Sequence, residues 1–154
     1  IGREGRVFKM IKLRSMVPNA EAILAEYLAD NPVEAREWNE KQKLINDPRI
    51  TPIGRLIRKT SLDELPQLWN VMTGEMALVG PRPIMVDQKA LYPSAAYYDL
   101  RPGITGPWQV SSRNESSFVE RAHFDATYLN NMSFANDARI MLKTVKVVVN
   151  ATGH

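Results

Sequence analysis

The chain has 154 residues, of which 44% are hydrophobic and 24% are charged. This size and balance predict one folded domain over residues 1–154 and exclude a disordered protein. Cysteine is absent, which excludes disulfides, thiolate zinc sites and cysteine nucleophiles, and a net charge of +3 from 20 basic and 17 acidic residues is too balanced for a chain dedicated to nucleic acid.

The sequence also bears on membrane segments and on histidine chemistry. The apolar runs are all shorter than the ~20 residues that cross a bilayer, and no secretory signal opens the sequence. Because the first residue is Ile1 rather than methionine, we expect an excerpt from which an upstream part, with any membrane anchor, has been removed. His123 and His154 are far apart, so neither a histidine metal site nor a Ser-His-Asp triad is expected.

Hydrophobic periodicity predicts helices separated by a few short strands. In the first half we expect a strand over 7–16, amphipathic helices over 19–30 and 33–45 with Pro32 closing the first, and a short basic turn at 55–59. In the second half we expect a helix from the acidic residues 63–64 to about Met72, a strand at 76–79 and a helix over 84–98 broken at Pro93. A loop at 101–110 should enter a short strand, and a capping box at Ser117 should open a helix to about Leu129. A final helix is expected from 136 or 137 to 146, although its valine-rich end also fits a strand. Helices outnumber strands, so the expected fold class is α+β, a mostly helical single domain.

Two adjacent carboxylates, Asp63 and Glu64, stand out because leucines enclose them in the segment Thr60-Ser61-Leu62-Asp63-Glu64-Leu65-Pro66-Gln67-Leu68. Carboxylates in such a setting are poorly hydrated. They are usually retained where a positive charge, a metal ion or a reaction uses them.

The same residues also fit a helix cap. Ser61 and Glu64 match a capping box, and a helix capped at Asp63 instead would place Pro66 in its first turn without cost. In either register both carboxylates lie at a helix N-terminus, whose dipole would keep Asp63 ionised. An ionised aspartate can be a nucleophile, so capping and catalysis are compatible.

Four motifs follow one another along the chain: Lys12-Leu13-Arg14-Ser15-Met16, the segment 58–67, Gly80-Pro81-Arg82-Pro83, and Arg101-Pro102-Gly103-Ile104-Thr105-Gly106. In this combination the chain resembles the bacterial sugar transferases, the monotopic phosphoglycosyl transferases that start the assembly of exopolysaccharides, O-antigens and capsules. The resemblance covers nearly the whole chain, and the segment 107–114 is most similar to exopolysaccharide-initiating members.

The resemblance implies transfer of a sugar-1-phosphate from a nucleotide diphosphate sugar, by analogy a UDP-hexose, to undecaprenyl phosphate. By the same analogy Asp63 is the nucleophile that forms a covalent phosphosugar intermediate, and Glu64 binds or positions Mg²⁺. Diphosphate oxygens and water would supply most of the metal's ligands, which agrees with the lack of a dense cluster of ligand residues in the sequence.

Basic residues are expected around the acidic pair, because a diphosphate repels an attacking carboxylate and cations must offset its charge. Lys12, Arg58 and Arg82 match basic positions of the family, and Arg101 is a further substrate-binding candidate. Arg82 lies between two prolines, which hold its guanidinium in a fixed direction for phosphate oxygens. The alternative for each is an ordinary surface charge.

One acidic residue outside the pair is also a candidate. Asp125 matches a family position in the segment Phe124-Asp125-Ala126-Thr127-Tyr128, where it would orient an arginine or the surroundings of the metal. The alternative is a structural salt bridge to Arg121, which shares a helix face with Asp125 and Tyr128.

Family members enter the bacterial inner membrane from its cytoplasmic face through an N-terminal hydrophobic segment, and this sequence begins after that segment. The resemblance therefore implies the same location. Apolar residues between 53 and 69, with nearby arginines and a lysine, suit amphipathic segments that lie in the membrane interface, and packing against the core is an equal alternative; they are Ile53, Leu56, Ile57, Leu65, Leu68, Trp69, Arg55, Arg58 and Lys59.

Three functions are open at this point. The favoured one is the phosphoglycosyl transferase, and the second is a catalytically silent module that recruits polysaccharide machinery. The third is a basic nucleic-acid-binding domain that uses Lys9, Lys12, Arg14 and the run 55–59; the balanced charge disfavours it, so no nucleic-acid partner is expected. Galactose and glucose are both compatible sugars, and the oligomeric state is open.

Overall fold

Helices dominate the computed structural model, which describes residues 1–111 and 118–149. The helices are α1 (Ala20–Asp30), α2 (Pro32–Lys41), α3 (Pro52–Lys59), α4 (Gln67–Met72), α5 (Ala96–Asp99), α6 (Pro107–Val110), α7 (Arg121–Asn130) and α8 (Phe134–Val149), with short 3-10 turns at Arg3–Gly5, Leu62–Glu64 and Asp87–Leu91. Strands β1 (Ala77–Val79) and β2 (Gly103–Thr105) pair in parallel. The α+β, mostly helical prediction is confirmed.

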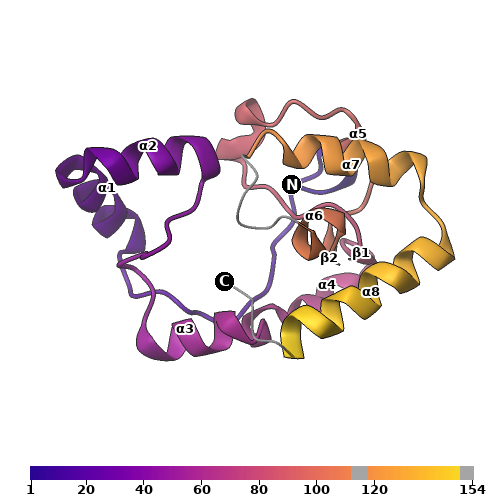
Figure 1. The fold of residues 1–154 in the computed structure, drawn as a ribbon, viewed down its shortest axis with the longest axis horizontal. Coiled ribbons are helices and arrows are strands. Elements are labelled where there is room, and N and C mark those ends of the chain that lie inside the picture. Colours follow the sequence, from indigo (N-terminus) through magenta and orange to yellow (C-terminus); the bar gives the residue numbers. More distant parts are fainter. Residues whose placement is uncertain (112–117, 150–154) are drawn as a thin grey trace.

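The elements are arranged along two edges of an elongated molecule (Figure 1). Helices α5 and α7 follow one edge, α3, α4 and α8 follow the other, and the strands with α6 lie between α7 and α8. Helices α1 and α2 form one end and contribute no buried residue. The buried core accordingly lies at the other end, in two clusters: Ile1, Ile84, Tyr92, Tyr97 and Phe118, and Val79, Leu100, Tyr128 and Ile140.

Parallel pairing brings the turn at 80–83 against the loop at 101–106. The Gly80 N–H donates to the Thr105 carbonyl at 2.9 Å, and the Gly103 N–H donates to the Pro81 carbonyl at 2.8 Å. A Cβ at Gly106 would lie 2.1 Å from the Gly80 carbonyl oxygen, so this approach requires glycine. The 80–83 turn, which carries Arg82, and the 101–106 loop are therefore hydrogen-bonded to each other although they are separate in the sequence.

The prediction of a strand over residues 7–16 is wrong. This segment, which we call the strap (residues 7–16), forms no strand, and its one ladder contact among the described residues is an isolated antiparallel bridge between Met16 and Ile50. Ile11 and Leu13 are 43% and 47% exposed, so the apolar face suggested by alternation is not buried. Without a neighbouring strand, the alternating pattern has no sheet to join.

Several predicted boundaries in the first half also change. The helix over 19–30 is confirmed as α1, but Pro32 opens α2 as its first helical residue, where its missing N–H costs nothing. Helix α2 ends at Lys41 instead of 45, because Gln42 adopts a left-handed conformation with φ 54°. The basic turn expected at 55–59 is the second part of α3, which Thr51 caps by accepting a hydrogen bond from the Gly54 N–H at 2.9 Å.

In the second half, β1 is confirmed, whereas the helix predicted over 84–98 is reduced to the 3-10 turn Asp87–Leu91 and α5. The strand expected after the 101–110 loop lies inside it as β2, because Pro107 starts helix α6. Ser117 lies outside the described residues, and α7 ends at Asn130, close to the predicted end. The valine-rich C-terminal segment is helical.

No helix in the described part of the chain is both long enough and apolar enough to cross a bilayer.

Candidate active site

The acidic pair lies on the 3-10 turn Leu62–Glu64 between α3 and α4, and neither predicted capping register is correct. Ser61 is left-handed, with φ 57°, and its side chain makes no capping hydrogen bond. Helix α4 begins at Gln67, directly after Pro66, whose ring and missing N–H suit a helix start and not a helix interior. The charge of Asp63 is therefore not set by the N-terminus of a helix.

The two carboxylates differ in their surroundings. Glu64 is half-buried and accepts a hydrogen bond from Arg82 Nη1 at 3.1 Å, which is also an ion pair. Asp63 is more deeply buried, with 6% of its surface exposed, and forms no ion pair within 4 Å in the described ranges. The pair thus consists of one neutralised carboxylate and one that is enclosed without a direct salt bridge.

Opposing effects act on Asp63. Burial and the adjacent charge of Glu64 raise the pKa of Asp63, whereas the positive charges of Arg58 and Lys12 lower it. A buried carboxylate whose ionisation depends on neighbouring cations is a candidate nucleophile, because its negative charge is poorly solvated and available to a phosphorus atom.

Arg58 is held in place by the strap. Its Nε donates to the Ser15 hydroxyl at 2.7 Å, and Ser15 is buried. The Ser15 carbonyl in turn accepts the Thr51 N–H at 3.1 Å, at the start of α3. A Cβ at Gly54 would lie 1.9 Å from that carbonyl oxygen, so α3 approaches the strap this closely because residue 54 is glycine.

Lys12 is positioned by three anchors along the strap. Asn70, which is 1% exposed, accepts the Ile11 N–H at 3.1 Å and donates to the Lys9 carbonyl at 2.9 Å. The Leu13 N–H donates to the Asp63 carbonyl at 3.0 Å, so the strap is bonded to the backbone of the acidic pair itself. Lys12 lies between these anchored residues and cannot move far from Asp63.

The electrostatics of Lys12 agree with this placement. Lys12 retains solvent access, but the protein atoms around its ammonium, followed by the charges of Arg82 and Arg58, lower its pKa. Asp63 and Glu64 oppose that shift. Three cations therefore surround two carboxylates, and the cluster carries positive charge in excess.

The other two predicted residues do not join this cluster. Arg101 is exposed at the start of the 101–106 loop, and within the described residues no contact links its side chain to the acidic pair. Asp125 is 3% exposed inside the core and accepts a hydrogen bond from the Tyr92 hydroxyl. Burial raises the pKa of Asp125 to about 6.

Arg121 connects Asp125 electrostatically to the cluster. Its guanidinium carbon lies 4.0 Å from the centre of the Trp108 ring and 4.8 Å from that of Phe118, and no Arg121–Asp125 ion pair within 4 Å occurs in the described chain. Burial and then the charge of Arg82 lower the pKa of Arg121 to about 10. The salt bridge considered for Asp125 is thus replaced by a Tyr92 hydrogen bond, with Arg121 stacked between aromatic rings.

Sequence reasoning missed the residues that position the cations. Ser15 lies within the first of the four motifs without any signal of a role of its own, and no motif surrounds Asn70. Their partners lie far away along the chain, 43 residues for the Ser15–Arg58 bond and 59 and 61 residues for the Asn70 bonds. No periodicity or local spacing could have linked them.

A magnesium ion would find few protein ligands here. No group of three or more His, Cys, Asp or Glu side chains is arranged for a metal within residues 1–111 and 118–149. Asp63 and Glu64 offer hard carboxylate oxygens of the type Mg²⁺ prefers, in a number that fits an ion held mainly by substrate phosphates and water. The donor set is therefore compatible with the expected Mg²⁺ in that form.

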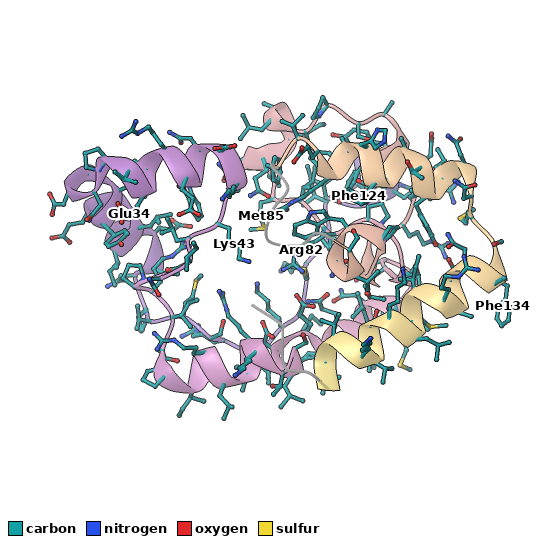
Figure 2. All side chains as sticks on the ribbon, viewed as in Figure 1. Glu34, Lys43, Arg82, Met85, Phe124 and Phe134 are labelled. Carbon is teal, nitrogen blue, oxygen red and sulfur yellow. The ribbon has the colours of Figure 1, made fainter. Side chains whose placement is uncertain are left out.

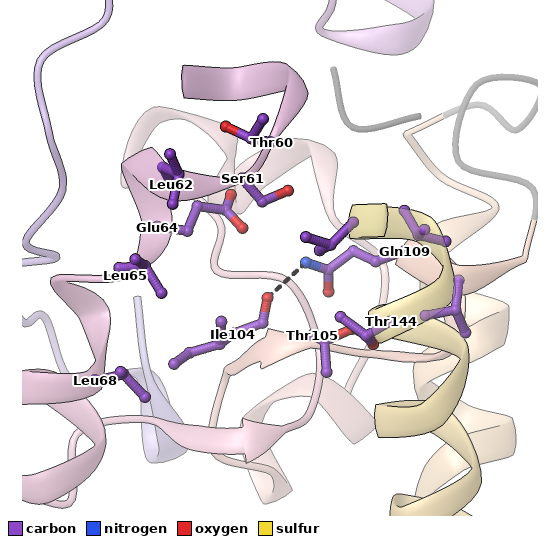
Figure 3. Close-up of a pocket in the computed structure, with 13 residues that line it drawn as sticks. Thr60, Ser61, Leu62, Glu64, Leu65, Leu68, Ile104, Thr105, Gln109 and Thr144 are labelled. Atoms are coloured by element: carbon purple, nitrogen blue, oxygen red, sulfur yellow. Dashed lines mark hydrogen bonds between the residues drawn. The ribbon is translucent and has the colours of Figure 1, made fainter. Parts of the chain in front are cut away.

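A pocket of about 240 Å³ opens beside Glu64 (Figure 3). Leucines of the 62–68 segment form one wall, and Thr144 with the end of α8 faces them across the pocket. Gln109 lies at its base, where its Nε2 donates to the Ile104 carbonyl at 2.8 Å. Glu64 therefore has the cationic cluster on one side and an apolar pocket on the other.

These features define a class of site. A buried carboxylate beside three cations can bind a negatively charged phosphate ester and attack its phosphorus, which is the arrangement that phosphoryl transfer through a covalent intermediate requires. The model of the bacterial sugar transferases matches residues 1–151, so this chain belongs to the bacterial sugar transferase family.

Similar proteins carry names that agree with one another. The chain is 52% identical, over 99% of its length, to a UDP-galactose-lipid carrier transferase of Erwinia amylovora, and 50% identical to an undecaprenyl-phosphate galactose phosphotransferase of Salmonella typhimurium. It is 46% identical to the exopolysaccharide production protein ExoY of Sinorhizobium fredii. The chain spans 32%, 33% and 69% of the lengths of these three proteins.

Proposed function

We propose that this chain is the catalytic part of a phosphoglycosyl transferase that moves a sugar-1-phosphate from a nucleotide diphosphate sugar to undecaprenyl phosphate, at the start of exopolysaccharide or glycoconjugate synthesis. The observation that carries the proposal is Asp63, a buried carboxylate beside Arg58 and Lys12 and next to the Glu64–Arg82 ion pair. The names of the relatives support the lipid acceptor, and one of them supports a UDP-hexose donor.

The proposed reaction has two displacements at one phosphorus. An oxygen of Asp63 attacks the phosphorus that bears the sugar, and the bond from this phosphorus to the bridging oxygen breaks, so the nucleoside monophosphate leaves with the electron pair. An oxygen of the lipid phosphate then attacks the same phosphorus, and the Asp63 oxygen leaves as a free carboxylate. No proton has to be transferred in either step, so the site needs cations beside Asp63 and no general acid or base.

The cations have distinct proposed roles. Arg58 and Lys12 lower the cost of keeping Asp63 ionised and attract the diphosphate, whereas Arg82 binds phosphate oxygens from the rigid 80–83 turn. Glu64 would hold or position Mg²⁺, which when bound neutralises diphosphate charge. Asp125 supports the site from the core, where it accepts the hydrogen bond of Tyr92 and its charge acts on Arg121.

The membrane surface is the proposed location, because a lipid acceptor must reach Asp63. Apolar side chains on α3 and α4 are exposed: Ile53 (75%), Leu56 (63%), Trp69 (59%) and Met72 (78%). Packing against the core, the alternative considered for the apolar residues between 53 and 69, does not explain side chains that are this exposed. With Arg55 and Lys59 nearby, they form a face suited to the interface of a membrane, which we place at the cytoplasmic side of the bacterial inner membrane.

The deciding experiment incubates the protein in lipid vesicles with undecaprenyl phosphate, Mg²⁺ and UDP-galactose or UDP-glucose, and measures release of UMP. We expect release with wild type, loss of at least about 10³-fold in Asp63→Asn, and a sugar-phosphate adduct in intact-protein mass spectra. Asp99→Asn, an exposed residue of α5, is the matched control. Full turnover by Asp63→Asn would exclude the covalent mechanism, and no turnover with any nucleotide sugar would favour the silent recruitment module.

A further inference from the structure

The pocket beside Glu64 has a lining that offers little to a polar ligand. Seven of its thirteen lining residues are aliphatic: Leu62, Leu65, Leu68, Ile104, Val110, Val147 and Val148. A sugar or a nucleotide would leave hydroxyl and N–H groups without hydrogen-bond partners against such walls, which disfavours its binding. The composition of the walls therefore favours a hydrocarbon occupant.

Three threonines of the pocket already make hydrogen bonds within the protein. Thr60 donates to the carbonyls of α3, with the Leu56 oxygen at 3.0 Å. The hydroxyls of Thr105 and Thr144 are 2.7 Å apart, and Thr144 also bonds to the Ile140 carbonyl at 2.9 Å. These groups turn their polar atoms toward the protein and leave their methyl groups for a ligand.

Gln109 also offers no polar atom to a ligand in the pocket. Its Nε2 is bonded to Ile104, and its Oε1 is buried without a partner, 3.3 Å from the position a Cβ would take on Gly106. Because this oxygen has almost no accessible surface, it offers no acceptor to a molecule in the pocket. The polar end of the pocket is thus formed by Ser61 and Glu64.

The position of the pocket indicates where the hydrocarbon comes from. Leu62, Leu65 and Leu68 line it and are 45–54% exposed, so its wall continues onto the apolar face of α3 and α4. Its volume of about 240 Å³ is far above the roughly 10–15 Å³ that one water needs by the same measure, so it has room for a branched five-carbon unit. The Glu64 carboxylate stands at the polar end.

We propose that this pocket binds the isoprene units nearest the phosphate of the lipid acceptor, with the C-terminal part of α8 as one wall. The assignment rests on the proposed function for the identity of the acceptor. In this arrangement Val147 and its neighbours hold the start of the lipid chain, so that the phosphate at its end lies beside Glu64, within reach of Asp63. An apolar anchor next to a charged cluster orients an amphipathic substrate without using any polar contact.

Photo-crosslinking tests the location directly. Farnesyl phosphate carrying a diazirine in the isoprene unit nearest the phosphate is irradiated with the protein in detergent micelles, and labelled peptides are identified by mass spectrometry. We expect adducts on the three segments that line the pocket, residues 60–68, 104–110 and 144–148, and unlabelled farnesyl phosphate should reduce them. Adducts elsewhere, or no adduct, overturn the proposal.

Variants sharpen the test. Val147→Phe fills the pocket and should lower the adduct yield about tenfold or more, since it excludes several buried CH₂ groups. Val145→Phe, on the same helix but 59% exposed and outside the pocket, should leave the yield unchanged. Equal yields in the two variants contradict the proposal.

A second pair guards against misfolding of the filled variant. Leu65→Asn places a polar group at the exposed mouth of the pocket and should also reduce labelling, whereas Leu91→Asn, at a similarly exposed leucine of the 3-10 turn Asp87–Leu91, should not. The proposed function is judged separately by UMP release. Wild type that releases UMP but is labelled elsewhere disproves the pocket assignment alone, and wild type without any UMP release disproves the reaction.

Discussion

Asp63 owes its raised pKa first to burial and then to its charged neighbours. The adjacent Glu64 raises the pKa further, while Arg58 and Lys12 lower it. In the proposed reaction the cations that lower the pKa of Asp63 would also contact the phosphates, so binding and activation would depend on the same side chains.

This balance predicts shifts of opposite sign. Glu64→Gln removes a negative neighbour and should move the pKa of Asp63 downward, whereas Arg58→Met removes a positive neighbour and should move it upward. The measurement is an NMR titration of the Asp63 carboxyl carbon, which does not require activity. Arg55→Met, an exposed arginine of the same helix, is the control, and shifts in the same direction for both variants would disprove this account.

Asp125 allows a prediction about stability and pH. Its pKa rises to about 6 in the folded protein, from an ordinary value of 3.8, so the folded state holds a proton that the unfolded state releases. Stability from this residue is complete below about pH 4 and is lost as the pH rises through 6, by up to about 3 kcal/mol.

Urea denaturation of wild type and Asp125→Asn at pH 4.0–7.5 measures this effect. The asparagine remains neutral and can still accept the hydrogen bond of Tyr92, so the stability difference between the two proteins should shift in favour of the variant between pH 4 and pH 6. Asp99→Asn is the matched control on the surface. A constant difference across this range would show that the buried carboxyl does not titrate there.

The cations of the site could be predicted from the sequence because each stands inside a recognisable motif: Lys12, Arg58 and Arg82. Arg101 could not be separated from them, since a motif does not reveal that its arginine points to solvent. Ser15 and Asn70 could not be predicted, because their roles depend on hydrogen bonds that span 43 to 61 residues.

Helix α3 and the strap depend on one another through Gly54. Its missing Cβ leaves room for the Ser15 carbonyl, and Ser15 holds Arg58. We expect Gly54→Ala to push the strap away, to lower stability by about 2 kcal/mol and to reduce UMP release more strongly than stability alone explains. The measurements are urea denaturation and the vesicle assay.

Gly74→Ala is the matched control for this substitution. Gly74 ends the turn after α4 with φ 79°, and nothing lies within 4 Å of its Cβ position. Alanine there should cost about 1 kcal/mol through backbone strain and leave catalysis intact. Equal loss of UMP release in both variants would show that the approach of α3 to the strap has no catalytic importance.

Elements with strong local signals were predictable, and elements defined by distant partners were not. Helix α1 follows from its apolar spacing, and β1 from a short apolar run before a turn. The strap alternates like a strand but is held by Asn70 and by the backbone of Asp63, so its pattern could not distinguish an edge strand from an anchored extended segment.

Across the whole molecule, helices α3 and α4, which carry exposed apolar residues, lie along one edge, and α2 lies at the opposite side (Figure 1). Other apolar side chains are exposed as well. Phe134 projects outward at the start of α8 and is 86% exposed (Figure 2). A membrane would cover the α3–α4 edge, since it offers both a hydrocarbon layer and anionic lipid for nearby arginines.

Vesicle sedimentation checks this orientation. Leu56→Asp should reduce binding to anionic vesicles about tenfold or more, because it places a charge in the apolar edge. Val33→Asp, at a similarly exposed residue of α2, should bind like wild type. Added salt should weaken the wild-type interaction in part. Equal loss in both variants would contradict the proposed membrane-facing edge.

The α1–α2 pair has a consequence for how the chain can change. Its two ends meet, because the Val17 N–H donates to the Arg49 carbonyl at 2.9 Å beside the Met16–Ile50 bridge. Residues between 17 and 49 therefore form an excursion that returns to its starting point, and the Phe118 N–H, which donates to the Glu40 carbonyl at 3.1 Å, ties the end of α2 to the domain. Length and sequence within α1 can vary at a small entropic cost, so new contacts could arise there while Lys12 and Arg58, on either side of the base of the excursion, stay in register.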